Sequence, residues 1–189
     1  MIYLGGEAEV RILDEVVIKR RISKRYRIKE LDEEIRFKRT RTEAKIISAA
    51  RKVGVATPII LDVEGDTIVM ERIKGPTAKD CMNKDLCREI GKSLAKMHSA
   101  NIIHGDVTPA NIIVSKGKIY FVDFGLAYFD SDVEAKGVDL HVFIESLKAL
   151  YDDWEELRNS FLDGYLEFGS REVVERVKEI ELRGRYVRR

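Results

Sequence analysis

Residues 104–114 read HGDVTPANIIV, and the tripeptide DFG follows at residues 123–125. Phosphoryl transfer requires phosphates and magnesium to be held in line with an acceptor, so acid and amide groups must converge on one cleft. Asp106, Asn111 and Asp123 are candidates for these groups, because they fall in loops that follow a predicted helix and a predicted strand. Either tripeptide alone could be an ordinary turn, since Asp and Gly are turn formers. Both together, at this spacing, favour a phosphoryl-transfer site.

The spacing matches the pattern HRDxxxxN followed by DFG, which is typical of protein kinases. By that pattern Asp106 is the base toward the acceptor, while Asn111 and Asp123 bind metal. Gly105 stands where the pattern has arginine. In ordinary kinases that arginine commonly pairs with a phosphorylated activation loop, so its loss predicts no such switch. Asp139 follows Asp123 by sixteen positions, and no Ala-Pro-Glu sequence or peptide-docking segment fits between them.

The sequence predicts an α+β, protein-kinase-like bilobal fold with a small β-rich N-lobe and a minimal helical C-lobe. The runs IYL, AEVRIL and VVIKRR predict a meander of three strands, and residues 30–53 predict one long helix or two. IILDVEG and TIVMERI predict a hairpin that turns at residues 64–66. We place the lobe boundary after residue 73, which gives an N-lobe at 1–73 and a C-lobe at 74–189, together one kinase domain.

Lys19 is the predicted phosphate-binding lysine of the N-lobe. It directly follows an apolar run and resembles the lysine of V-A-I-K, whereas Arg20 points to the other face by strand alternation. A basic strand edge in contact with solvent is the alternative. Glu43 is its predicted partner, because it lies in the more apolar second half of the predicted helix. The competing acids Glu30, Glu33 and Glu34 are expected on the surface.

Gly5 and Gly6 lie in GGEAEV, between the first two predicted strands. The segment departs from GxGxxGxV by having only two glycines. Its position still makes it the candidate loop over the phosphates, because backbone N–H groups in a Gly-permissive turn can approach a phosphate closely.

Taken together, the motifs resemble those of the small atypical kinase and ATPase subunit of the KEOPS complex, the p53-related protein kinase family. The resemblance covers nearly the whole chain, through GGEAEV, IKRRISKRYR, RTEAKII, VMERIKG, HGDVTPANII, VDFGLAYF and the arginine-rich end RGRYVRR. It implies ATP and magnesium in the cleft, with Met70, Glu71 and Ile73 at the inter-lobe hinge beside the nucleotide. It also implies that His104 orients the DFG region and that Asp139 accepts backbone hydrogen bonds from the catalytic loop. The alternative is that Asp139 is an acidic residue near the N-terminus of a helix with no role in the site.

The resemblance further implies ATP hydrolysis that supports threonylcarbamoyladenosine modification of tRNA, besides serine/threonine kinase activity toward the chain itself. The implied partners are the catalytic threonylcarbamoyl-transferase subunit and a small regulatory subunit, with tRNA close by. The acceptor would often be water, or a partner would complete the site. Arg183, Arg185, Arg188 and Arg189 would contact the partner or tRNA, whereas terminal arginines without any contact are the alternative.

Two other function classes stay open. One is a RIO-type kinase or a small-molecule phosphotransferase; RIO-type chains usually carry an extra N-terminal domain, for which this chain leaves no room before its first predicted strand. The other is a pseudokinase scaffold, which would have no chemical reason to keep Lys19, Asp106, Asn111 and Asp123 together.

Composition adds weaker constraints. The net charge of +1 forces no class of partner, and the absence of a long apolar run or a signal peptide predicts a cytoplasmic protein with no membrane contact. Cys81 and Cys87, six apart on an apparently helical segment, are expected to be free thiols. His98 is expected to cap or pack its helix instead of binding metal. Residues 19–45 hold twelve Lys or Arg against five Asp or Glu, an excess that fits either a solvated helix face or an RNA-facing stripe.

Overall fold

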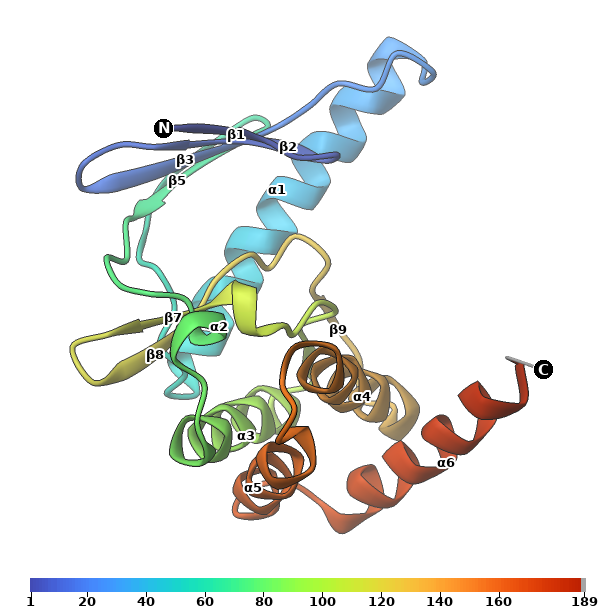
Figure 1. The fold of residues 1–189 in the computed structure, drawn as a ribbon. Coiled ribbons are helices and arrows are strands. Elements are labelled where there is room, and N and C mark those ends of the chain that lie inside the picture. The colour runs from blue at the N-terminus through green and yellow to red at the C-terminus, as the bar shows by residue number, and fades with distance from the viewer. Residues whose placement is uncertain (188–189) are drawn as a thin grey trace.

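The computed structural model describes residues 1–187, with side chains through residue 183. The N-terminal part is an antiparallel sheet with the strand order β1-β2-β3-β5-β4, lying against one long helix, α1 (Figure 1). The predicted meander, the hairpin and a single helix are all present. Their bounds are β1 (Ile2–Leu4), β2 (Ala8–Ile12), β3 (Val16–Arg21), α1 (Lys29–Lys52), β4 (Ile60–Glu64) and β5 (Thr67–Glu71).

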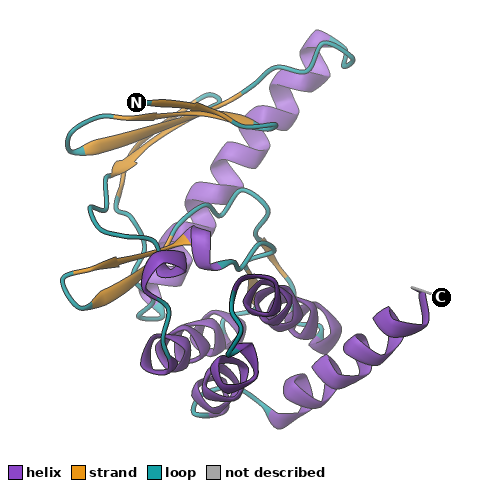
Figure 2. Ribbon diagram, viewed as in Figure 1, coloured by secondary structure: helices purple, strands orange, loops and turns teal. Residues whose placement is uncertain are grey.

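The C-terminal part is mostly helical, as Figure 2 shows, apart from short strand pairs near the link between the two parts. Strands β7 and β8 form a second hairpin over the turn at 116–117, and the two-residue strands β6 and β9 also pair with each other. Strands as short as β6 and β9 cannot be recognised from sequence alternation. The elements are α2 (Ala78–Cys81), α3 (Lys84–Ser99), β6 (Ile102–Ile103), the 3-10 turn η1 (Pro109–Asn111), β7 (Ile112–Ser115), β8 (Lys118–Phe121), β9 (Tyr128–Phe129), α4 (Val133–Leu150), α5 (Trp154–Leu166) and α6 (Arg171–Val187). Together the two parts form the predicted kinase-like α+β fold.

The main hydrophobic core does not stop at the predicted lobe boundary. Ile46, Ile47 and Ala50 of α1 are buried in it together with side chains of α3, α4, α5 and α6. A separate small cluster of Ala44, Ile68 and Met70 joins α1 to the sheet. Burial of a large aliphatic side chain contributes about 1.5–3 kcal/mol, so α1 is anchored firmly at its C-terminal end. The division after residue 73 stays a prediction.

Cys81 and Cys87 do not share one helix, which corrects the sequence-based expectation. Asn83 lies between them, and its side-chain oxygen accepts a 2.9 Å hydrogen bond from the Leu86 N–H, which caps a new helix. Both thiols are free, as predicted. In the part of the chain that is described, every helix falls short of the length and apolarity needed to cross a bilayer.

Candidate active site

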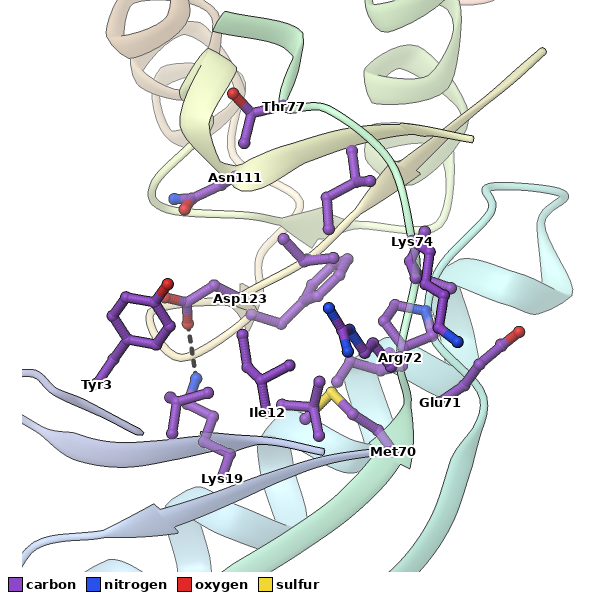
Figure 3. A pocket seen from close by; sticks show the side chains of 18 of the residues that line it. Tyr3, Ile12, Lys19, Met70, Glu71, Arg72, Lys74, Thr77, Asn111 and Asp123 are labelled. Atoms are coloured by element: carbon purple, nitrogen blue, oxygen red, sulfur yellow. Dashed lines mark hydrogen bonds and ion pairs between the residues drawn. The ribbon is translucent and has the colours of Figure 1, made fainter. Parts of the chain in front are cut away.

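A cleft of about 810 Å³ lies between the sheet and the C-terminal part, at the link that joins them. This volume is within the range of small-molecule and cofactor sites. Figure 3 shows that Lys19, Asp123 and Asn111 occupy one end, while Glu71, Arg72 and Lys74 lie at the other. The wall between these ends is mainly apolar, with side chains from β2, β3, β5, β7 and residue 122, namely Val10, Ile12, Val17, Met70, Ile113 and Val122.

Lys19 holds two carboxylates at the polar end of the cleft. Its Nζ donates to Glu43 Oε1 at 2.6 Å and to Asp123 Oδ1 at 2.6 Å, so the predicted pairing of Lys19 with Glu43 is present. Burial lowers the pKa of Lys19, but Glu43 and Asp123 more than offset this, and the pKa lies above its ordinary value. The lysine therefore stays positively charged and suited to phosphate.

Asp123 is the exposed member of this group, with 54% of its side chain accessible. Its partial burial raises the pKa, but the Lys19 ammonium and a hydrogen bond from the Gly125 N–H bring the pKa below the ordinary value of an aspartate. Asp123 also has a left-handed backbone with φ of 58°. Such a conformation is uncommon outside glycine, and it is found both in turns and at active sites.

Arg21 is a site residue that the sequence analysis missed. Its Nη2 donates to Glu43 Oε2 at 2.6 Å, so Glu43 binds two cations at once. Strand alternation could have found it, because residues 19 and 21 share one face of β3 while the exposed Arg20 lies on the other. The acids Glu30, Glu33 and Glu34 are exposed, as expected.

Asn111 connects the predicted catalytic loop to the cleft. Its Nδ2 donates to Asp106 Oδ2 at 2.9 Å and to the Asp106 carbonyl at 3.0 Å. The amide nitrogen is therefore committed to Asp106, which leaves the amide oxygen for a hard cation. Asp106 is partly buried and, among the residues described, lies just outside the set that lines the cleft.

Asp139 of α4 binds the backbone of the predicted catalytic loop. It is 1% exposed and accepts the His104 N–H at 2.7 Å and the Gly105 N–H at 2.8 Å, the contacts that the kinase resemblance implies. His98 packs beside it, with Nε2 3.3 Å from the Asp139 carboxylate and Nδ1 2.9 Å from the Tyr165 hydroxyl. Burial lowers the pKa of His98, so it is neutral at physiological pH and serves packing, as predicted.

His104 is fully buried against the DFG segment. Its ring centroid lies 4.6 Å from that of Phe124. The side chain thus contacts the DFG region, and an orienting role remains our prediction.

Gly105 has a steric reason to replace arginine. Its φ is +80°, a left-handed conformation that costs other residues roughly 1–2 kcal/mol. A Cβ at this position would also lie 2.6 Å from the Leu126 carbonyl oxygen, a backbone atom that cannot easily move. The segment that follows Asp123 is short, because β9 pairs with β6 and α4 already begins at Val133. The chain therefore turns back where a long activation segment would otherwise run.

The glycine loop differs from the expected arrangement. Of the residues described, the cleft lining includes neither Gly5 nor Gly6. Lys24 Nζ donates to the Gly6 carbonyl, and Arg39 of α1 pairs with Glu7 at 2.9 Å, so the loop is bound to α1 and to the segment before it. Tyr3, which the sequence analysis overlooked, also lines the cleft and is labelled in Figure 3.

The remaining predicted residues fall in three groups. Met70, Glu71 and Ile73 line the hinge end of the cleft, as expected. Arg183 pairs with Glu134 of α4 at 2.7 Å and is thus engaged within the chain. The side chain of Arg185 and the whole of Arg188 and Arg189 lie outside the described residues.

The polar end of the cleft fits magnesium bound together with phosphates. Within residues 1–183, no three His, Cys, Asp or Glu side chains cluster in a way that could hold a metal by themselves. Magnesium usually takes only one or two protein carboxylates and completes its shell with phosphates and water. The Asp123 carboxylate and the Asn111 amide oxygen match that chemistry.

Comparisons with known proteins agree with this geometry. The RIO domain model matches residues 11–136. A "probable serine/threonine-protein kinase BUD32 homolog" of Archaeoglobus fulgidus is 66% identical over the whole chain and 97% of its own length. "KEOPS complex subunit Bud32" of Pyrococcus abyssi is 40% identical over 98% of this chain and 96% of its own.

In longer relatives, a segment similar to this chain forms only one part. A "probable bifunctional tRNA threonylcarbamoyladenosine biosynthesis protein" of Methanoculleus marisnigri is 46% identical over 97% of this chain, which spans only 35% of that relative. Among solved structures, the Rio2 kinase complex from Chaetomium thermophilum has a TM-score of 0.68 at 14% identity, covering 100% of this chain and 71% of its own. That likeness supports the fold.

The RIO match bears on one alternative from the sequence. We set a RIO-type kinase apart from a KEOPS subunit, but the match over 11–136 and the Bud32 relatives bring both interpretations into one family. The chain belongs to the RIO-domain proteins and, among them, to the Bud32 family.

Proposed function

We propose that the protein is an atypical serine/threonine kinase and ATPase that binds ATP and magnesium in the cleft. The observation that carries the proposal is the convergence of Lys19, Glu43 and Asp123, with Asn111 and Asp106 adjoining. The apolar wall suits the adenine, and the charged Lys19 suits the phosphates. Asp123 and the Asn111 amide oxygen would hold magnesium, which, when bound, neutralises charge on the phosphate oxygens.

Asp106 is the proposed base. It accepts the proton of the attacking hydroxyl or water, and Asn111 fixes its carboxylate for that purpose. Asp139 positions the same loop through the two backbone N–H groups that it accepts. Because the segment after Asp123 is short, the chain offers little surface for a peptide substrate, and water or a group from a partner is the acceptor that fits best.

The proposal extends to tRNA modification in the cytoplasm, within a KEOPS complex. Its support is that the Pyrococcus abyssi relative is named a KEOPS subunit and that bifunctional relatives carry this chain joined to about twice its length of other sequence. A separate threonylcarbamoyl-transferase subunit would supply that second part, and a small regulatory subunit would complete the assembly.

Phosphate release from γ-labelled ATP tests this function. The full chain is measured with magnesium, alone, with the transferase subunit, and with that subunit and tRNA. We expect the partner to stimulate release of inorganic phosphate, with slow labelling of the chain itself. Efficient label transfer to a free metabolite or unrelated protein, whether or not the partner is present, would instead favour a general phosphotransferase. Nucleotide binding without turnover in every arm would favour a pseudokinase.

Two groups stand out among the twelve basic residues at 19–45. Lys19 and Arg21 bind Glu43, while Arg27 and Arg36 bind the buried Asp32. These cations are internal and are unavailable to RNA.

Lys38, Arg41 and Lys45 form a second set, which we call the α1 basic face. They are exposed and follow one another at helical spacing on α1, and no ion pair to them occurs among the described side chains. Lys45 lies over the Phe129 ring at 5.6 Å, which places this face near the segment after Asp123. We include the α1 basic face in the proposal as a contact for tRNA phosphates.

Changing Lys38, Arg41 and Lys45 together to Gln is expected to weaken tRNA binding by the assembled complex. The slope of log affinity against log salt should fall by about 3, because each lost phosphate contact removes about one unit. Filter binding over a salt series measures both quantities. The matched control changes Lys52, Lys118 and Lys178, three other exposed lysines, to Gln. Equal effects of the two triple variants would refute a localised contact.

A further inference from the structure

Glu43 binds two buried cations that come from the same strand. Lys19 reaches Oε1 and Arg21 reaches Oε2, both at 2.6 Å. The Glu43 side chain is 2% exposed, that of Arg21 5% and that of Lys19 10%. At such burial, an ion pair that loses one partner leaves a charge that water cannot solvate.

The two cations differ in what else they hold. Lys19 Nζ is shared between Glu43 and Asp123, and in the proposed function it also meets the phosphates. Arg21 has Glu43 as the one side-chain acceptor of its guanidinium within the described part of the chain, and its Nε is buried without a partner. Its backbone N–H donates to the Asp66 carbonyl at 2.9 Å, which fixes the end of β3 against the neighbouring turn. Phosphates would therefore compete for Lys19 but not for Arg21.

From this asymmetry we infer that Arg21 is a positioning residue that holds Glu43, and with it α1, against β3 whether or not nucleotide is present. The inference rests on the proposed function, because it concerns the Lys19–Glu43 pair that would bind ATP. In kinases that are switched on and off, that pair forms only when the helix carrying the glutamate is in place. Here the second cation makes the pair permanent.

Two further features of the structure agree with a fixed α1. The C-terminal half of the helix is buried in the main core through Ile46, Ile47 and Ala50, so it cannot swing freely. The short path from Asp123 to α4 leaves no long activation segment that could move the helix. Arg21 secures Glu43, through which α1 binds Lys19.

The test compares Arg21→Met with Arg20→Met in the full chain. Arg20 is the adjacent arginine on the exposed face of β3, so it provides a matched control. We expect Arg21→Met to lower kcat/KM for ATP on the order of 100-fold, because small misplacement of a catalytic group has effects of this size. Arg20→Met should leave kcat/KM within about twofold, since surface changes have small effects.

Hydrogen exchange of α1 amides over residues 36–47 separates positioning from general stability. In the wild type, protection of these amides should be the same with and without a magnesium–ATP analogue. In Arg21→Met, exchange without nucleotide should be faster, and the analogue should restore protection through Lys19. In a Glu43→Gln background, Arg21→Met should change kcat/KM by less than about twofold, because the two residues act as one unit.

The outcomes distinguish this inference from the proposed function. If Lys19→Met abolishes turnover while Arg21→Met behaves like Arg20→Met, the Arg21 inference is wrong and the ATP site stands. If Lys19→Met leaves turnover intact, the proposed function itself is wrong. If Arg21→Met does not fold, the test uses Arg21→Lys, which keeps the positive charge on a shorter side chain. This variant should have an intermediate kcat/KM, and protection of its α1 amides should depend on nucleotide. Protection equal to that of the wild type without nucleotide would overturn the inference.

Discussion

Replacing Asp106 with asparagine is expected to lower ATP turnover by roughly 100- to 10,000-fold, the range for loss of a general base. The amide has almost the same shape as the carboxylate but cannot take up a proton. The contact of Asp106 Oδ2 with Asn111 Nδ2 at 2.9 Å fixes the group that would be lost. Affinity for nucleotide should change little, because Asp106 lies just outside the residues described as lining the cleft.

Single-turnover phosphate release, with the partner subunit present, measures this effect. Nucleotide affinity is determined in parallel by calorimetry, so that a loss of binding is not mistaken for a loss of chemistry. Asp62→Asn is the control, because Asp62 is an exposed carboxylate on β4, far along the chain from the catalytic loop. Turnover that is unchanged in Asp106→Asn would rule out its role as the base.

The second large effect is expected at Asp123. Replacement with alanine should abolish magnesium-dependent binding of ATP, because the carboxylate that remains ionised beside Lys19 is the strongest candidate ligand for the metal. Lys19 would keep its contact with Glu43, so the positive charge for phosphate would remain in place. We therefore expect weak ATP binding that does not depend on magnesium to remain in Asp123→Ala.

Calorimetric titration of ATP at saturating magnesium and with magnesium removed measures the difference. Asp152→Ala supplies the control, since Asp152 is an exposed carboxylate just before α5. Tight ATP binding by Asp123→Ala at saturating magnesium would show that the metal is held elsewhere.

The sequence predicted the parts of this molecule that depend on short motifs with fixed spacing. Asp106, Asn111 and Asp123 lie in loops whose neighbouring strands are apolar runs, so the chemistry and the local structure agree. The pairing of Lys19 with Glu43 was harder to predict, because it depends on how a 24-residue helix packs against β3. Apolar periodicity on that helix was still sufficient to select Glu43.

What the sequence did not predict depends on the backbone path or on shared partners. The left-handed conformation of Gly105 and the closeness of the Leu126 carbonyl are properties of two loops that meet in space. Arg21 was overlooked because the kinase motif singles out one lysine on this strand, and Arg21 meets Glu43 only when α1 packs against β3. The contacts of the glycine loop with Lys24 and Arg39 join residues far apart in the sequence, so no local pattern reveals them.

The burial of the lower half of α1 has a consequence for how this protein folds. A fragment ending at residue 73 would carry Ile46 and Ile47 into water, and the complementary fragment would lack the side chains that fill its centre. Cutting at the hinge would therefore yield two incomplete pieces, not two autonomous folding units. The chain is expected to gain and lose its structure in one cooperative step, in which the helix that carries Glu43 is common to both halves.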